Sequence, residues 1–106
     1  MRLHAHLFFD ASEHEAASRI RERIVSRLPP MVFTGPLLLR AAGPLPLPMF
    51  QLEYGEAVSR EVRDVMEACR EGRSVLIHPL LEDELAAHTT HAVWRGQPLA
   101  LRLDKL

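Results

Sequence analysis

Histidine is the residue type in this chain whose number and spacing point most directly to chemistry. The segment Leu3-His4-Ala5-His6-Leu7-Phe8-Phe9 alternates with a period of two, so His4 and His6 share one face of an expected strand. At a rise of about 3.3 Å per residue their Cα atoms are about 7 Å apart, which lets both imidazole rings approach one ion. Imidazole binds zinc, iron, copper and nickel, so this pair predicts a metal site.

A third histidine, His78, ends an apolar segment over residues 73–78 that is expected to form another strand. It would join His4 and His6 if the two strands are neighbours. The alternative is an exposed sheet face on which the histidines simply contact water. Glu53 could reach the same face as a ligand or a general base, and the alternative for it is an exposed carboxylate at a strand end.

His88 and His91 are three residues apart and could share a helical face, although Thr89 and Thr90 suggest that the helix ends between them. They are candidates for handling protons or substrate. The alternative is that they serve as cations or caps at a helix terminus. The chain has no Gly-x-Ser-x-Gly, no phosphate-binding glycine loop, no Cys-x-x-Cys and no His-Glu-x-x-His, so no nucleophile motif competes with the histidines.

The elements that position these residues follow from hydrophobic periodicity and from proline and glycine. Asp10 and Glu13 form a capping-box pattern that starts a helix, and Pro29-Pro30 ends it near residue 28. We expect strands over residues 3–9, 31–34, 49–54 and 73–78, helices after Asp10 and over 56–71 and 81–88, and a terminal hairpin of 92–94 and 98–103. The prolines between residues 37 and 48 exclude a central strand there.

This order of elements predicts an α+β, ferredoxin-like (split βαβ) two-layer sandwich with an antiparallel sheet and a C-terminal extension or hairpin. Residues 1–106 would form a single domain. The strand at 73–78 would lie antiparallel beside the strand at 3–9. Both long helices would cover the face with Leu3, Ala5 and Leu7, leaving the histidine face open to a second copy or to a lid from the C-terminal hairpin.

The composition narrows the class of partner. The 106 residues carry 13 basic and 14 acidic side chains and a formal net charge of -1, which gives no preference for nucleic acid or for an anionic membrane. The single cysteine, Cys69, excludes an internal disulfide and favours a reducing cytoplasm. The apolar runs are short, so neither a membrane span nor a signal peptide is expected.

Four segments, which together span nearly the whole chain, resemble the DOPA 4,5-dioxygenase family. They are His4-Ala5-His6, Gly43-Pro44-x-Pro46-x-Pro48-Met49-Phe50, Val75-Leu76-Ile77-His78-Pro79 and His88-x-x-His91-Ala92-x-Trp94-x-Gly96-x-Pro98-Leu99. The resemblance implies a ferredoxin-like domain, usually a homodimer, that opens a small catechol-like aromatic with O2 at a histidine-bound metal.

Carried onto this chain, the resemblance implies that His4, His6 and His78 form the metal shell. His88 and His91 would be the catalytic residues that move protons or handle substrate. The metal would be Fe(II) or another divalent ion. A purified sample could contain zinc or nickel instead.

The chain departs from the family pattern at two positions. Where the pattern has a histidine after Arg-Phe and another in Gly-Pro-His-Pro, this chain has Leu38 and Leu45. These changes motivate an alternative: a catalytically impaired relative that acts as a small dimeric protein binding a metal or an aromatic ligand. A third alternative is a structural domain whose histidines have no chemical role.

Overall fold

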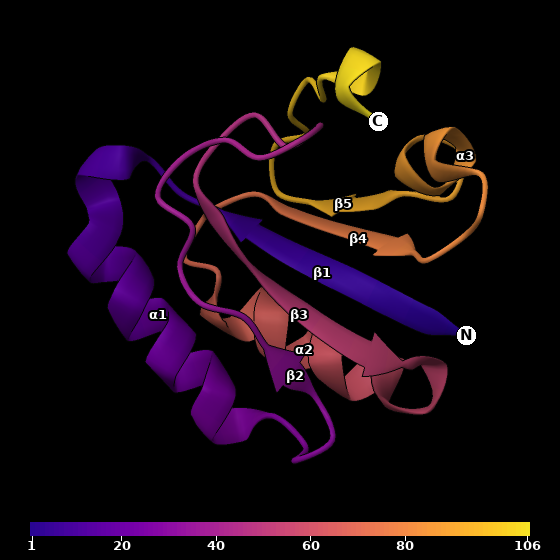
Figure 1. Ribbon diagram of the computed structural model, residues 1–106. Coiled ribbons are helices and arrows are strands. Elements are labelled where there is room, and N and C mark those ends of the chain that lie inside the picture. The colour runs from indigo at the N-terminus through magenta and orange to yellow at the C-terminus, as the bar shows by residue number, and fades with distance from the viewer.

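The computed structural model describes residues 1–106 and contains a five-stranded antiparallel sheet in the order β2-β3-β1-β4-β5 (Figure 1). The strands are β1 Arg2–Phe8, β2 Phe33–Thr34, β3 Met49–Gly55, β4 Val75–Pro79 and β5 Val93–Arg95. The helices are α1 His14–Arg27, α2 Ser59–Cys69 and α3 Glu84–His88, with 3-10 turns at Ala11–Glu13, Glu56–Val58 and Leu103–Lys105. The fold is therefore of the α+β class, as the sequence predicts. None of its helices has both the length and the apolar character needed to cross a bilayer.

Strand β1 lies at the centre of the sheet, between β3 and β4. The β1–β3 register places His4 opposite Glu53, and the β1–β4 register places His4 opposite His78. The predicted antiparallel pairing of the 73–78 strand with the 3–9 strand is confirmed. Because side chains alternate along a strand, this register puts His4, His6 and His78 on one face of the sheet.

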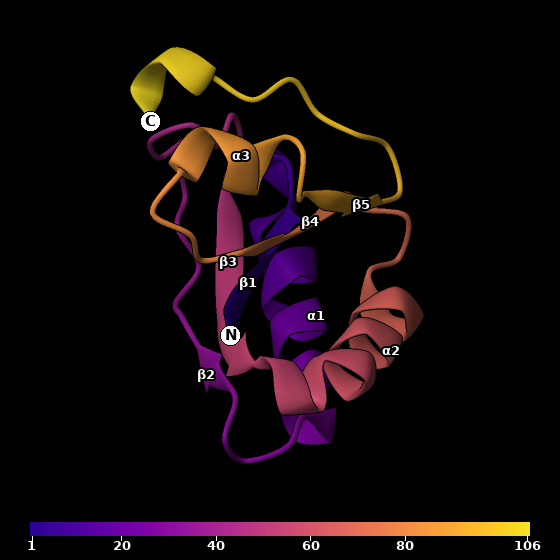
Figure 2. The same cartoon turned by 90° about the vertical axis from the view of Figure 1, so that its right-hand side faces the viewer.

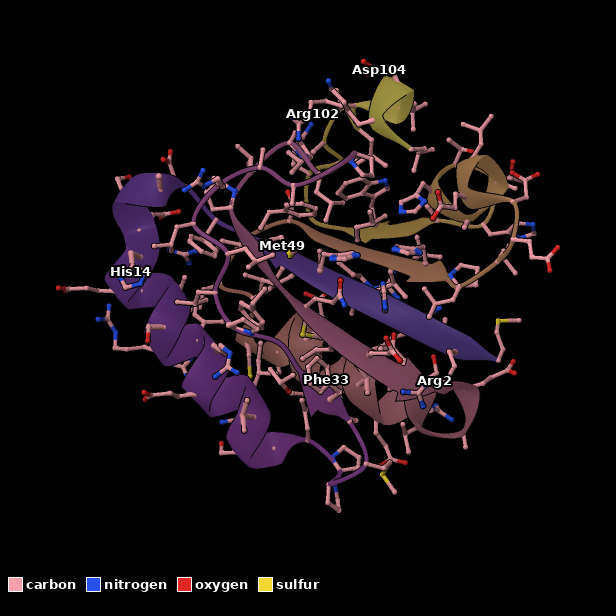
Figure 3. All side chains as sticks on the ribbon, viewed as in Figure 1. Arg2, His14, Phe33, Met49, Arg102 and Asp104 are labelled. Carbon is pink, nitrogen blue, oxygen red and sulfur yellow. The ribbon has the colours of Figure 1, made fainter.

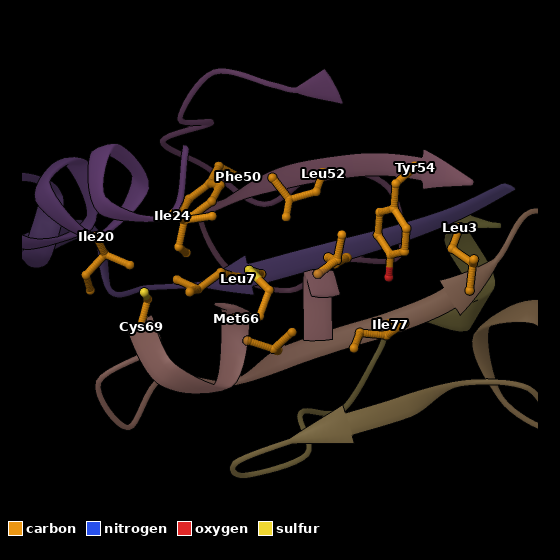
Figure 4. Close-up of a cluster of buried hydrophobic side chains, with 13 residues drawn as sticks. Leu3, Leu7, Ile20, Ile24, Phe50, Leu52, Tyr54, Met66, Cys69 and Ile77 are labelled. Atoms are coloured by element: carbon orange, nitrogen blue, oxygen red, sulfur yellow. The ribbon is translucent and has the colours of Figure 1, made fainter. Parts of the chain in front are cut away.

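Helices α1 and α2 cover the other face of the sheet (Figure 2), as the sequence predicts. On α1, Ile20 and Ile24 are fully buried against the sheet. On α2, the fully buried residues are Val62, Met66 and Cys69. In both helices the spacing of these residues places them on one side of the helix. Each such side chain contributes about 1.5–3 kcal/mol by leaving water. The core consists of Leu3, Ala5, Leu7, Ile20, Ile24, Phe50, Leu52, Tyr54, Val62, Met66, Cys69, Val75 and Ile77 (Figure 4).

A second apolar cluster covers one end of the histidine face of the sheet. Phe8, which continues the His4 and His6 row, packs in a second apolar cluster with Leu45, Met49 and Leu76. The partly buried side chains packed against this cluster are Ala92, Trp94, Leu99 and Leu101. The C-terminal segment and the loop before β3 therefore cover the Phe8 end of this face.

The predicted terminal hairpin is wrong. Strand β5 pairs with β4, and residues 98–102 form no strand. Pro98 has no N–H to donate to a ladder. Arg102 instead binds the loop at residues 43–45: its backbone N–H donates to the Pro44 carbonyl at 2.8 Å, and its guanidinium donates to the Gly43 and Leu45 carbonyls at 2.7 and 3.1 Å.

Several element boundaries also differ from the predicted ones. The predicted helix over 56–71 is a 3-10 turn followed by α2, which ends at Cys69 because Glu71 and Gly72 both adopt positive φ. The strand predicted over 31–34 is reduced to Phe33–Thr34. The capping box is present: the Asp10 carboxylate accepts from the Ser12 N–H, and the Asp10 N–H donates to Glu13.

Candidate functional site

Three imidazole rings meet on the helix-free face of the sheet. His4 and His6 come from β1 and His78 comes from the end of β4, and each offers one ligand atom such that the three atoms lie within 4.8 Å of one another. His6 and His78 are almost fully buried and His4 is partly buried. The structure thus brings together the three residues that the sequence suggested as metal ligands.

The contact between His6 and His78 defines the floor of the site. Their Nε2 atoms are 3.1 Å apart and their rings are nearly parallel. The Nδ1–H of His78 donates to the Pro79 carbonyl at 2.9 Å, because a carbonyl oxygen can only accept. The Nε2 of His78 therefore carries the free lone pair that faces His6.

Burial keeps both floor histidines in their neutral form. Desolvation is the main cause that holds the pKa of His6 well below its usual value, and positive charge on His78, His4 or His88 lowers it further. The pKa of His78 is lowered to about 4, chiefly by burial, with the Pro79 carbonyl acting in the opposite direction. Neutral imidazole is the form that binds a metal, so these two side chains need lose no proton at pH 7.

His4 is held by charged and polar neighbours on β3. Its Nε2 lies 2.9 Å from Oε1 of Glu53 and 3.4 Å from the amide nitrogen of Gln51. The other carboxylate oxygen of Glu53 accepts from Arg2 at 3.2 Å, and Arg2 projects beside β3 in Figure 3. The hydrogen bonds from His4 and then Arg2 hold the pKa of Glu53 below its usual value, so Glu53 is an anion that orients His4.

The donor set fits a divalent metal. Two imidazole nitrogens that bind one tetrahedral ion at about 2.1 Å are separated by about 3.4 Å, and the Nε2 atoms of His6 and His78 are 3.1 Å apart. Ligating histidines usually donate their second N–H to an outer partner. His78 has such a partner in Pro79, whereas Nδ1 of His6 is buried with none.

A pocket of about 290 Å³ opens above these rings. Its wall from α3 includes His88, whose ring centroid lies 4.1 Å from that of His78 and whose Nδ1–H donates to the Glu84 carbonyl at 2.7 Å. This leaves the second ring nitrogen of His88 without a proton in the neutral form. The lining residues are His4, His6, Pro44, Leu45, Gln51, His78, Leu80, Glu84, His88, Lys105 and Leu106.

The remaining histidines lie outside this pocket. Helix α3 ends at His88, and His91 is exposed on the following turn, where its backbone N–H donates to the Ala86 carbonyl. The structure therefore brings His88 to the three-histidine cluster but does not bring His91 there. His14 lies on the outer side of α1 (Figure 3) and is exposed.

The two leucines that depart from the family pattern differ in position. Leu45 is buried, lines the pocket and packs on Phe8 and Met49. Leu38 is 40% exposed and does not line the pocket. Only the change at Leu45 therefore alters the surface next to the histidines.

Sequence reasoning missed several residues of the pocket. Gln51 could have been found, because it alternates with Glu53 along the strand that pairs with β1. Glu84, Lys105 and Leu106 gave no signal, because short segments of no fixed period bring them to the site.

Three comparisons with known proteins agree on one group of enzymes. The model of the Dopa 4,5-dioxygenase family matches residues 3–105. A DOPA 4,5-dioxygenase of Amanita muscaria is 27% identical over 110 residues, covering 97% of this chain and 48% of the relative, so the chain spans about half the length of that curated relative. The crystal structure of a candidate dioxygenase from Nostoc punctiforme PCC 73102 has a TM-score of 0.88 at 31% identity, covering 97% of this chain and 88% of that one.

Proposed function

Because this chain belongs to the Dopa 4,5-dioxygenase family, we propose that it is an extradiol dioxygenase of a catechol-type aromatic. The observation that carries the proposal is the convergence of His4, His6 and His78 at the base of a pocket. In the proposed reaction a ring C–C bond next to one catechol hydroxyl breaks, and both atoms of O2 enter the ring-opened product. The electrons for O2 reduction come from the catechol, so no further reductant is needed.

His4, His6 and His78 would hold the metal. Fe(II), or another divalent ion, would supply a Lewis acid for the catechol oxygens and a place for O2 to react. Leu45 and Leu80 give the pocket an apolar wall against which the catechol ring would pack. Glu53 orients His4 by its 2.9 Å contact, as outer-shell carboxylates do for ligating histidines.

His88 is the proposed general acid or base. Its ring lies against that of His78 and lines the pocket, and its Nδ1–H is committed to the Glu84 carbonyl. The other ring nitrogen is therefore the one that would accept or return a catechol proton. A catalytic role for His91 remains part of the proposal, with sequence resemblance as its support, and His91→Ala tests it separately.

The assignment of the fold as ferredoxin-like also belongs to this proposal. It is supported by the strand order β4-β1-β3-β2 and by the two helices that cover one face of the sheet. Strand β5 extends this sheet at the β4 edge.

The proposal also includes the homodimer that the family resemblance implies. Phe33 and Leu39 are more than half exposed near the β2 edge, and light scattering of Phe33→Lys against the unaltered chain would test that edge as a contact.

The alternative is a relative that binds a metal or an aromatic ligand without turnover. One observation favours it: Leu45 lies in the pocket wall, where it can neither bind a metal nor transfer a proton. A pocket altered at this single point could retain binding while losing ring cleavage.

Anaerobic reconstitution with Fe(II), followed by O2 and a panel of catechols, separates the two functions. A dioxygenase forms the yellow ring-opened product, consumes one O2 per catechol and loses both activities in His78→Ala. His14→Ala is the matched control, since His14 is an exposed histidine on α1. Catechol binding without O2 uptake by the Fe(II) protein supports the non-catalytic alternative, and the absence of both rejects the proposal.

A further inference from the structure

Two segments that are far apart in the sequence each contribute part of the pocket wall. Pro44 and Leu45 lie at the tip of the loop before β3, and Lys105 and Leu106 lie in the C-terminal segment. The other lining residues come from β1, β3, β4, the residue after β4 and α3. Figure 1 shows the C-terminal segment (yellow) beside the tip of this loop (magenta). The shape of the pocket therefore depends on how the two segments are held against each other.

The loop before β3 leaves the sheet at an isolated bridge. Leu38 and Met49 exchange backbone hydrogen bonds of 2.8 and 3.0 Å at the base of the loop. At its tip, Ala42 and Leu45 exchange bonds of 3.2 and 2.9 Å across a turn in which Gly43 has a φ of 53°. The tip bonds lie within the loop, so they determine the shape of the turn but not its position.

Arg102 supplies every hydrogen bond that connects residues 39–47 to another segment. Its backbone N–H donates to the Pro44 carbonyl at 2.8 Å, and one guanidinium nitrogen donates to the Gly43 and Leu45 carbonyls at 2.7 and 3.1 Å. Figure 3 shows Arg102 beside this loop. Hydrogen bonds from a charged donor are stronger than neutral ones. Apart from these three bonds, which we call the Arg102 clamp, the turn is held by the packing of Leu45 in the second apolar cluster.

Arg102 also begins the turn that carries the other part of the wall. Its carbonyl accepts from the Lys105 N–H at 2.9 Å, which closes the 3-10 turn Leu103–Lys105. Leu99 and Leu101 pack on the second apolar cluster and anchor the preceding residues. Because both wall segments are bonded to Arg102, a displacement of this residue would separate them.

We propose that Arg102 is a positioning residue that holds the loop tip and the C-terminal segment together as one wall, and that the affinity of the pocket for an aromatic ring depends on the Arg102 clamp. The aromatic ligand rests on the proposed function, whereas the clamp itself does not. The three-histidine cluster lies on β1 and β4, which pair with each other without Arg102. Loss of the clamp should therefore weaken ring binding and leave metal binding unchanged.

Arg102→Met tests the proposal, because it removes both guanidinium bonds and keeps an unbranched side chain. Binding of 4-methylcatechol, a neutral probe, is measured by calorimetry under nitrogen on the protein loaded with Zn²⁺, so that no turnover interferes. We expect an affinity about threefold to tenfold lower than in the unaltered protein, because a wall that is in place for only part of the time lowers the apparent affinity in proportion. The Zn²⁺ affinity, measured without the catechol, should stay within about twofold, as expected of distant and independent sites.

Amide hydrogen exchange of the metal-free protein tests the clamp without any ligand. The N–H groups of Ala42 and Leu45 are bonded across the turn, so their exchange rates report how often the tip opens. Both should exchange at least about threefold faster in Arg102→Met, because the turn loses two bonds to the rest of the chain. The N–H groups of β1, at the centre of the sheet, should exchange as in the unaltered protein.

Three further variants separate the clamp from charge and from general damage. Arg40→Met removes an exposed arginine of the same loop and should change neither affinity. Arg102→Lys keeps the charge but not the forked donor, so its affinity for 4-methylcatechol should lie between those of Arg102→Met and the unaltered protein. Gly43→Val strains the turn through its φ of 53° although the added Cβ meets open space, so it should weaken ring binding alone, as Arg102→Met does. Circular dichroism verifies that each variant is folded.

An unchanged affinity for 4-methylcatechol in Arg102→Met would overturn the proposal. An equal loss of Zn²⁺ affinity would also overturn it, as would unchanged exchange at Ala42 and Leu45. If the unaltered protein loaded with Zn²⁺ does not bind 4-methylcatechol, the proposed function is rejected, and the exchange rates still decide whether Arg102 holds the wall. If 4-methylcatechol binds equally with and without the clamp, only this inference is rejected.

Discussion

The Nε2 atoms of His6 and His78 lie 3.1 Å apart although the two residues do not face each other in the sheet. In the β1–β4 register His6 faces Leu76 and His78 faces His4, so His6 and His78 are diagonal neighbours. Diagonal side chains on one sheet face are within reach of each other when they are long. The spacing of the two rings is therefore set by the central strands, which hold a site more rigidly than loops do.

This arrangement predicts that His6 and His78 are both needed to retain a metal. In protein purified without an affinity tag, His78→Ala or His6→Ala should reduce bound divalent metal from about one ion per chain to less than about one tenth. Two remaining imidazoles bind too weakly to survive purification. Elemental analysis by mass spectrometry measures the content, and His14→Ala should leave it unchanged. Full metal content in both alanine variants would rule out this cluster as the metal site.

The buried neutral histidines predict that the metal-free protein loses stability in acid. The pKa of His78 is about 4 in the folded chain and about 6.5 when unfolded, so the unfolded state binds more protons as the pH falls below 6.5. The free energy of unfolding should therefore be highest above pH 6.5 and should decrease by about 3 kcal/mol at pH 4 from His78 alone. His6, whose pKa is also lowered, adds to the decrease in the same direction.

Urea unfolding in the presence of a chelator, at a series of pH values from 8 to 4, measures this dependence. The variant His78→Gln, which cannot be protonated there, should show a shallower decrease than the unaltered chain. A variant His14→Gln should follow the unaltered chain, because His14 is exposed. Identical profiles for His78→Gln and the unaltered protein would contradict burial of a neutral His78.

Glu53 is predicted to act on the metal through His4. Glu53→Gln keeps the size of the side chain but removes the anion that accepts from His4 and from Arg2. Loss of such an outer partner typically costs about 10- to 100-fold in metal affinity, and we expect the lower end because Glu53 is 35% exposed. Calorimetric titration with Zn²⁺ measures the affinity, and Glu56→Gln provides a matched control on the exposed turn after β3. An unchanged Zn²⁺ affinity in Glu53→Gln would exclude this role.

The central part of the fold could be predicted because its residues repeat with regular periods. The alternation from Leu3 to Leu7 identifies the faces of β1, and the register then brings His4 and His78 together. The spacing of Ile20 and Ile24 identifies the buried side of α1 in the same way. Hydrophobic periodicity thus located both the core and the three-histidine cluster.

The C-terminal part could not be predicted in the same way. The Leu99 and Leu101 alternation indicates a strand, but these side chains pack on the second apolar cluster, and Arg102 binds carbonyl groups of a distant loop. Such tertiary contacts override local preference. They also bring Lys105 to the pocket.

Leu45 is predicted to be the departure from the family pattern that changes the chemistry. Leu45→His should increase Zn²⁺ affinity about tenfold and increase any ring cleavage, because it adds an imidazole to the pocket wall. It should also lower the free energy of unfolding by about 1–2 kcal/mol, since Leu45 packs in an apolar cluster. Leu38→His is the matched control, and it should alter neither property because Leu38 is exposed outside the pocket. An equal gain of affinity in both variants, or none in Leu45→His, would show that the metal does not approach this wall.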